Sequence, residues 1–143
     1  MAQTTPAHIN HFYRSVLEAN SYPGPAVVIA YTACMPEHGI ADDAATRQAK
    51  LAVESRAFPL FTYDPRRGSS MAERLSLVGN PAIRDDWAKL PDGTVIDFLT
   101  FARSEARFAP HFAPDGTPSP EILATREERL ANWRALQELA GIR

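Results

Sequence analysis

The first 65 residues alternate between helix-like and strand-like patterns of apolar positions. Residues 5–20 predict a helix in which Thr5 caps the first turn and Pro6 takes the first helical position. Its apolar residues recur every three or four positions and predict one buried face, made of Ile9, Phe12, Tyr13, Val16 and Leu17. The polar residues of this helix fall outside that face and are expected in solvent: His8, His11, Arg14 and Glu18. The segment Tyr-Pro-Gly-Pro at 22–25 then ends the helix.

Residues 26–31, with the sequence AVVIAY, form a short apolar run without alternation. Such a run is typical of a strand covered on both faces, as in the centre of a parallel sheet. A loop at 32–39 follows, and then a helix over 42–55 that begins at Asp42 or Asp43 and a second strand over 59–63. That second helix packs through a face of small residues, Ala45, Ala49, Ala52 and Val53. This order of elements predicts an α/β fold and matches half of a doubly wound sheet.

The C-terminal half predicts a tail of loops and two helices. Residues 66–93 are polar and rich in turns, with a short extended piece at 75–77. A helix over 97–108 is capped by Asp97 and turns Phe98, Phe101 and Ala102 inward. After a Pro-rich connection at 109–118, the signal Ser-Pro-Glu at 119–121 starts a helix that runs to about residue 140 and ends at Gly141. Its apolar stripe consists of Ile122, Leu123, Leu130, Trp133 and Ala140.

Two predicted strands are too few for the sheet that the apolar run at 26–31 implies. A buried parallel strand needs neighbours on both edges and helices on both faces. The chain therefore reads as a C-terminal slice of a larger α/β sheet. We expect the isolated chain to expose an apolar patch above the ~300–600 Å² that is common on monomers.

Composition excludes several classes of protein. The chain has 143 residues, of which 45% are hydrophobic, so it is globular rather than disordered. With 15 basic and 17 acidic residues the formal net charge is −2, which argues against nucleic-acid binding. No apolar run approaches the ~20 residues that cross a bilayer, and the N-terminus lacks the pattern of a signal peptide. A single cysteine excludes an intramolecular disulfide and favours a cytoplasmic location.

Cys34 is the residue most open to a chemical role, because it follows the predicted strand at 26–31. In open α/β sheets, ligands bind outside the carboxyl ends of the strands. Three interpretations are open. Cys34 packs as a small, partly buried hydrophobe, it is a nucleophile assisted by His38 or Glu37, or it is one thiolate ligand of an iron–sulfur cluster whose other three cysteines lie outside this sequence.

The other polar residues give weaker signals. The four histidines are scattered over a helix, a loop and a Pro-rich connection, so no shared metal site is predicted for His8, His11, His38 and His111. Arg66 and Arg67 could meet an anion, but the favoured interpretation is a solvated pair in a loop. The alternating charges at 103–107 predict surface ion pairs among Arg103, Glu105 and Arg107. Neither a P-loop nor a dinucleotide-binding glycine motif is present.

Residues 20–65 resemble the C-terminal end of the pyruvate:ferredoxin (flavodoxin) oxidoreductases. That family carries the motif Y-x-G-P-[SA]-[LVI]-[LVI]-I-A-Y-x-x-C, then H-G-I, then Q-x-x-L-A-V-x-S and P-L-[FY]-x-Y-[DN]-P. The matching positions follow in order: Tyr22, Gly24, Pro25, Ala26, Ile29 to Tyr31, Cys34, His38 to Ile40, Gln48, Leu51 to Val53, Ser55, Pro59, Leu60, and Tyr63 to Pro65. One departure is the spacing before His38, where Met35, Pro36 and Glu37 stand in place of the two residues of many members.

The resemblance implies a fold and a role. Residues 1–65 would be the distal part of a three-layer, doubly wound thiamine-diphosphate-binding domain, and 66–143 a mostly helical C-terminal tail. The family oxidatively decarboxylates pyruvate or another 2-oxoacid with thiamine diphosphate and Mg²⁺. It passes electrons through 4Fe–4S clusters to ferredoxin or flavodoxin and forms acyl-coenzyme A. By resemblance, Cys34 is the distant fourth ligand of the cluster nearest the thiamine.

The thiamine and magnesium sites, the other cluster cysteines and the substrate-binding groups lie upstream in the family. This chain is therefore expected to be a fragment that carries no cofactor and has no activity alone, and that joins the missing upstream part in a complete, homodimeric enzyme. The alternatives are a non-catalytic docking module or separately encoded subunit of such a complex, and a small cysteine hydrolase built on Cys34 and His38.

Overall fold

Four short strands form one mixed sheet in the order β2-β1-β3-β4. The computed structural model describes residues 1–143, and the strands are β1 (Ala2–Thr4), β2 (Val28–Ala30), β3 (Phe61–Tyr63) and β4 (Leu75–Ser76). Strand β1 pairs in parallel with β2, with Ala2 opposite Val28, and antiparallel with β3, with Ala2 opposite Thr62. Strand β4 pairs antiparallel with β3. A separate hairpin joins β5 (Ala88–Lys89) to β6 (Val95–Ile96).

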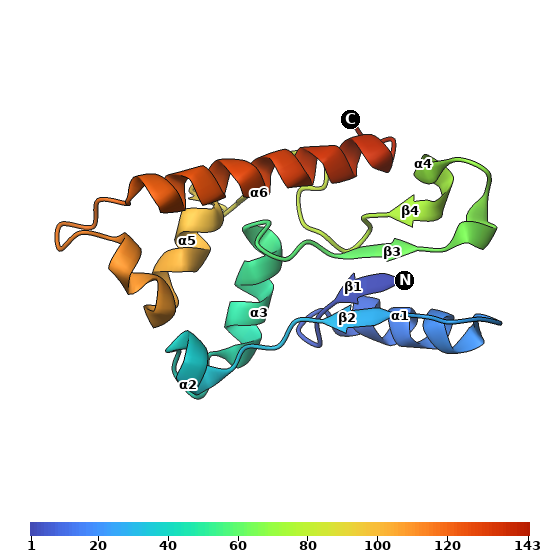
Figure 1. Cartoon of the computed structure of the whole chain (residues 1–143), viewed down its shortest axis with the longest axis horizontal. Helices are drawn as coiled ribbons and strands as arrows, with labels where there is room; N and C mark the ends of the chain where they lie inside the picture. The colour runs from blue at the N-terminus through green and yellow to red at the C-terminus, as the bar shows by residue number, and fades with distance from the viewer.

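The helices cover the sheet from opposite sides. Helix α1 (Ile9–Ser21) connects the parallel strands β1 and β2 and runs along them, whereas α6 (Pro120–Leu139) runs along β3 and β4 (Figure 1). Trp133 of α6 is fully buried against Leu75 and Leu77. A second core lies beside α3 (Ala45–Glu54), where Phe98 and Phe101 pack with Ala52 and Ile122.

The structure is mixed α/β with a helical C-terminal tail, as predicted, but its sheet differs from the predicted one. The N-terminal residues 2–4 form a strand that we did not predict, because three residues carry too little pattern to show one. The strand predicted over 26–31 is present as β2 and pairs in parallel, but it is not a covered, central strand in this chain: it lies at the edge of the sheet, and Ile29 is 40% exposed. The strand over 59–63 is confirmed as β3, although it runs antiparallel to its neighbours.

Helix α1 is turned about its axis relative to the prediction. Its N-cap is His8, which makes no capping side-chain bond, while the predicted cap Thr5 is fully buried before the helix. The polar side faces the sheet, because Ser15 is buried and His11 is half-buried. Most of the predicted core face is exposed instead, and we call these four residues the α1 stripe: Ile9, Tyr13, Val16 and Leu17.

The remaining helices agree better with the sequence. Ala49, Ala52 and Val53 of α3 are buried as predicted, although the helix begins after Ala44 and neither Asp42 nor Asp43 caps it. The short α5 (Phe98–Arg103) is capped by Asp97, and α6 by Ser119. A 3₁₀ helix, η2 (Ala106–His111), replaces the predicted end of α5. Three one-turn helices were not predicted: α2 (Met35–His38), η1 (Pro65–Arg67) and α4 (Met71–Arg74). None of the helices combines the length and apolar character that crossing a membrane requires.

Candidate functional site

Cys34 lies in a tight turn just beyond the carboxyl end of β2. It is the N-cap of the one-turn helix α2, with extended backbone angles, and its thiol is exposed and makes no capping bond. The backbone N–H of His38 donates to the carbonyl of Cys34 at 2.8 Å, which closes the turn. We call residues 31–40, which carry this turn, the cysteine loop. The loop therefore presents a free thiol to solvent on a hydrogen-bonded backbone.

Gly39 ends the cysteine loop against the C-terminal tail. Its φ of +63° is in the left-handed region, which side chains other than glycine rarely adopt. A Cβ atom at this position would also lie 2.4 Å from Cβ of Ala106, at the start of η2. Glycine is thus required here for two independent reasons, and the tail is in direct contact with the loop.

A buried carboxylate, Glu105, lies beneath the cysteine loop. Its Oε1 accepts hydrogen bonds from the hydroxyl of Tyr31 at 3.1 Å and from Nε2 of Gln48 at 2.8 Å. Its Oε2 accepts from Nε of Arg107 at 2.5 Å, and Nδ1 of His38 lies 3.4 Å from Oε1 without forming a hydrogen bond. The side chain of Glu105 is 0% exposed. The Glu105 cluster, as we call these five residues, joins the cysteine loop, α3 and the tail.

This cluster corrects the predicted surface ion pairs at 103–107. Only Arg107 pairs with Glu105, and it does so at a buried carboxylate, whereas Arg103 donates to the carbonyl of Gly116 and stacks over Phe112. A signal for the burial of Glu105 was present in the sequence. Residues 98, 101, 102 and 105 follow helical spacing, so Glu105 continues the inward face of Phe98 and Phe101.

Electrostatics in the cluster favour a neutral phenol beside a charged carboxylate. Burial raises the pKa of Tyr31 above its ordinary value, and the nearby Glu105 carboxylate raises it further. A tyrosinate here would lose its hydrogen bond to Glu105 and face a like charge. Arg107 supplies the compensating positive charge at the solvent side, where its side chain is 39% exposed.

Two of the three interpretations of Cys34 disagree with the geometry. The packing interpretation does not match this chain, in which Cys34 is exposed. The nucleophile interpretation needs a base directed at the thiol, but Cys34 has no side-chain hydrogen bond and Nδ1 of His38 faces Glu105 instead. An exposed thiol remains, suited to bind a group that comes from outside the chain.

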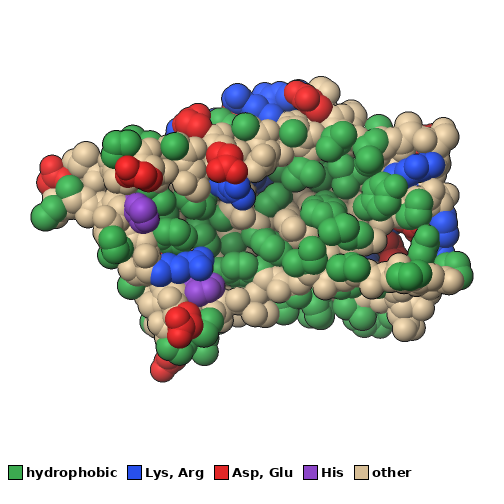
Figure 2. Space-filling model, viewed as in Figure 1, with side chains coloured by type: hydrophobic (Ala, Val, Ile, Leu, Met, Phe, Trp, Pro, Cys, Tyr) green, Lys and Arg blue, Asp and Glu red, His purple; other side chains and the backbone are tan.

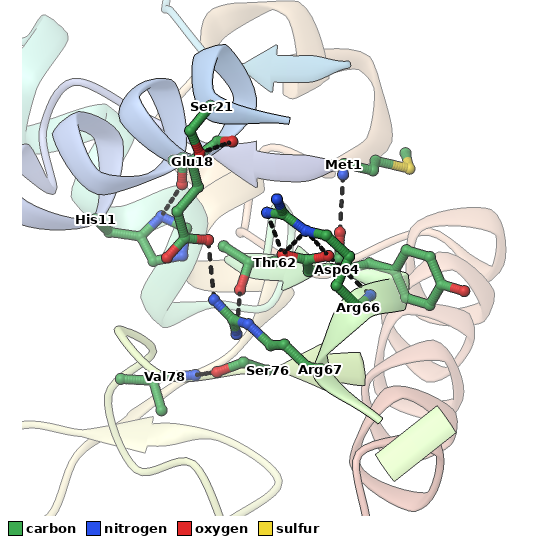
Figure 3. Close-up of polar contacts among 12 residues, drawn as sticks. Met1, His11, Glu18, Ser21, Thr62, Asp64, Arg66, Arg67, Ser76 and Val78 are labelled. Atoms are coloured by element: carbon green, nitrogen blue, oxygen red, sulfur yellow. Dashed lines mark hydrogen bonds and ion pairs between the residues drawn. The ribbon is translucent and has the colours of Figure 1, made fainter. Parts of the chain in front are cut away.

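A second polar cluster lies where α1 faces the end of β3 (Figure 3). Arg67 reaches back to Glu18 of α1 at 2.9 Å, and Arg66 pairs with Asp64 at 2.7 Å. A hollow of about 210 Å³ opens beside them, lined in part by Ser15 and Tyr22. Since both arginines are already paired with carboxylates, this region agrees with the predicted solvated loop pair rather than with an anion site.

The histidines are placed differently from the prediction. His8 and His11 were expected in solvent, but both are half-buried and burial lowers the pKa of each imidazole. His11 Nδ1 is hydrogen-bonded to Thr4 Oγ1 at 2.8 Å, which ties α1 to β1. His111 lies in η2, far along the chain from the others.

The chain can contribute to a metal centre but cannot complete one. No group of three or more His, Cys, Asp or Glu side chains is close enough to hold a metal ion. The donor chemistry at Cys34 is a single accessible thiol, and iron–sulfur clusters in proteins take four thiolates. The residues present therefore fit a cluster only as one ligand of four.

Several known proteins with similar sequences are pyruvate oxidoreductases. The chain is 43% identical over 136 residues to a pyruvate-flavodoxin oxidoreductase of Klebsiella pneumoniae and 32% identical over 134 residues to that of Rhodospirillum rubrum. These matches cover 90% and 93% of the chain. A pyruvate:ferredoxin oxidoreductase of Moorella thermoacetica is 36% identical over 86 residues, or 60% of the chain. The matches span only 6–10% of the length of these three relatives. No family model matches the chain.

Proposed function

The chain belongs to the family of the pyruvate:flavodoxin and pyruvate:ferredoxin oxidoreductases, and we propose that it is the C-terminal part of such an enzyme and supplies one thiolate to its electron-transfer chain. The observation that carries this proposal is Cys34, the single cysteine, exposed beyond the carboxyl end of β2. Cys34 also falls at the cysteine position of the motif that this sequence shares with the family.

Exposed apolar surface supports the view that the chain works as part of a larger protein. The α1 stripe holds Ile9 at 65% and Tyr13 at 63% exposure, on a helix whose apolar face would ordinarily be covered. Strand β2 leaves one edge unpaired, and Val27 beside it is 52% exposed. Figure 2 shows further apolar side chains spread over the face between α6 and the α1–β2 side. The relatives are about ten times as long as this chain, and the rest of the enzyme is the occupant that we propose for these surfaces.

In this proposal residues 1–65 complete a doubly wound thiamine-diphosphate-binding domain, with β2 as an inner strand once the enzyme is whole, and residues 66–143 brace it. Thiamine diphosphate, Mg²⁺, the other three cysteines of the cluster nearest the thiamine and all ligands of any further cluster belong to the remaining part. A 4Fe–4S cluster held by Cys34 and three cysteines of the remaining part would supply electron transfer from the 2-oxoacid towards ferredoxin or flavodoxin. Pyruvate and coenzyme A are the substrates, and the complete enzyme is a cytoplasmic homodimer.

The role of this chain's own residues is to hold one thiolate at a fixed place. The turn of α2 fixes the backbone of Cys34 through the His38 N–H bond to its carbonyl. Gly39 allows that turn to end directly against Ala106. The Glu105 cluster then joins the loop to the tail through the Tyr31 hydrogen bond and the contact with His38. Rigid support of this kind is what sets the position and electronic surroundings of a metal ligand.

Replacing Cys34 in the complete enzyme tests the proposal. Cys34→Ala should lower the iron content by up to one cluster per subunit and sharply reduce electron transfer to flavodoxin. Pyruvate decarboxylation should largely survive, because the thiamine site lies on other residues. Thr32→Ala, an exposed change in the same loop, is the matched control and should leave iron content unchanged. Full iron content and normal flavodoxin reduction in Cys34→Ala would contradict the proposal and favour a non-catalytic docking module.

A further inference from the structure

Glu105 is the one fully buried carboxylate of the chain, and its four polar neighbours come from three separate segments. Tyr31 and His38 come from the cysteine loop, Gln48 from α3, and Arg107 from η2. A buried charge is tolerated only where hydrogen bonds and a counter-charge offset its lost hydration. Oε1 has two donors and Oε2 has the guanidinium, so the carboxylate is fully engaged.

Gln48 shows how closely the tail fits this part of the chain. Its Nε2 donates to Glu105, and its Oε1 accepts from the hydroxyl of Ser104 at 3.0 Å. Both ends of one buried amide are thus held by two consecutive residues of the tail. Ala106 continues the contact, since its N–H points to the carbonyl of Gly39 at 3.4 Å. Residues 104–106 therefore contact the loop or α3 at three consecutive positions.

From this arrangement we infer that Glu105 is a positioning residue for Cys34: it clamps the cysteine loop to the tail and so sets where the thiol lies. The inference rests on the proposed function for its meaning in the enzyme, but the clamp itself is a property of this chain. Tyr31 precedes Cys34 by three residues and His38 follows it by four. Glu105 thus contacts the loop on both sides of the thiol, through a hydrogen bond from Tyr31 and a 3.4 Å approach to His38 Nδ1.

The test compares Glu105→Gln with the unchanged 143-residue chain. Glutamine keeps the shape of the side chain and removes its charge, so the attraction to Arg107 is lost. The new side-chain NH₂ group also faces a hydrogen-bond donor, because Tyr31, Gln48 and Arg107 all donate to Glu105. Amide hydrogen exchange at His38 and Gly39, whose N–H groups close the α2 turn, should accelerate at least about tenfold while exchange in α6 stays unchanged. Glu73→Gln is the control, because Glu73 bonds only to Ser69 and Ser70 near α4.

The phenol of Tyr31 gives a second readout that general loosening of the fold would not reproduce. Its titration is isolated by subtracting the ultraviolet pH titration of Tyr31→Phe. In Glu105→Gln it should move to lower pH, because the neighbouring negative charge is gone while Arg107 remains. If Glu105→Gln does not fold, Tyr31→Phe alone should still accelerate exchange at His38 and Gly39.

Two results would overturn the inference. One is a folded Glu105→Gln chain with unchanged exchange in the cysteine loop and an unchanged Tyr31 titration. The other is acceleration spread evenly over all amides, which would make Glu105 an ordinary contributor to stability. In the complete enzyme, Glu105→Gln should lower iron content or shift the cluster potential. If Cys34→Ala leaves the iron content of the complete enzyme unchanged while the exchange results hold in the isolated chain, the proposed function is wrong but the structural role of Glu105 is retained.

Discussion

Asn80 joins the C-terminal tail to the sheet, and replacing it should be among the most damaging single changes. Its side chain pairs with Leu60 just before β3: Oδ1 accepts from the N–H at 2.8 Å and Nδ2 donates to the carbonyl at 2.7 Å. Nδ2 also donates to the carbonyl of Leu77 at 2.7 Å. Leu60 is 0% exposed, so water cannot replace these bonds.

Asn80→Ala removes both partners of the Leu60 peptide groups, which have no other hydrogen bond. The carbonyl of Leu77 keeps one donor, the backbone N–H of residue 80 at 3.3 Å. At about 1–3 kcal/mol for each buried group left unpaired, the two Leu60 groups predict a loss of about 2–6 kcal/mol in the free energy of unfolding. At a slope of about 2 kcal/mol per molar urea, the midpoint should fall by about 1–3 M.

Equilibrium urea unfolding followed by tryptophan fluorescence measures this loss, since Trp133 is buried in the core next to Leu77. Asn132→Ala, on the exposed side of α6, is the matched control and should change stability by less than about 0.5 kcal/mol. If Asn80→Ala shifted the midpoint no more than this control, with an equal slope, the argument from unpaired peptide groups would be refuted.

Asn80→Asp tests the direction in which stability changes with pH. The carboxylate can still accept from the Leu60 N–H but faces two carbonyl oxygens, which favours its protonated form and raises its pKa in the folded state. A carboxyl group with a raised folded pKa stabilises most below its unfolded pKa of about 3.9 and loses that contribution as pH rises. The difference in stability between Asn80→Asp and the unchanged chain should therefore grow from pH 4 to pH 7.

Two further predictions concern α1. Burial lowers the pKa of His11, so the folded state prefers the neutral ring and stability should fall as pH drops below about 6.5. His11→Gln should flatten this pH dependence, measured as urea midpoints between pH 7.5 and pH 5. An unchanged pH dependence in His11→Gln would count against the buried position of His11. The exposed α1 stripe should bind a hydrophobic dye in the isolated chain. The double change Tyr13→Lys with Leu17→Lys should abolish most of that binding without lowering stability. Equal dye binding by the variant and the unchanged chain would mean that the stripe is already covered.

Local signals in the sequence predicted the local structure of the tail. The caps Asp97 and Ser119 start their helices where the sequence places them, because capping depends on a few adjacent residues. The small-residue face of α3 was predicted for the same reason. Helical periodicity identified the apolar face of α1 correctly but not its surroundings, since what covers a face is decided by residues elsewhere. In this chain the polar side carrying His11 and Ser15 meets the sheet.

Features that depend on distant residues could not be read from the sequence. Strand β1 is three residues long and exists because β2 and β3 pair with both of its edges. Glu105 was assigned to the surface because its flanking arginines suggested ion pairs in solvent; its helical spacing from Phe98 and Phe101 indicated the inward face, but not the partners that it meets there. Its burial depends on Tyr31 and Gln48, more than fifty residues away, which donate hydrogen bonds that offset the lost hydration of the carboxylate. The exposure of Cys34 likewise follows from the edge position of β2.

The central claim is that this chain is a working part of a pyruvate:flavodoxin oxidoreductase, and complementation tests it most directly. The purified chain is mixed with the remaining part of the enzyme, and pyruvate-dependent reduction of flavodoxin is followed with each part alone and with both. The account predicts no flavodoxin reduction by either part alone and clear reduction when both are present, lost again with Cys34→Ala. Full activity of the remaining part without this chain, or undiminished activity with Cys34→Ala, would contradict it.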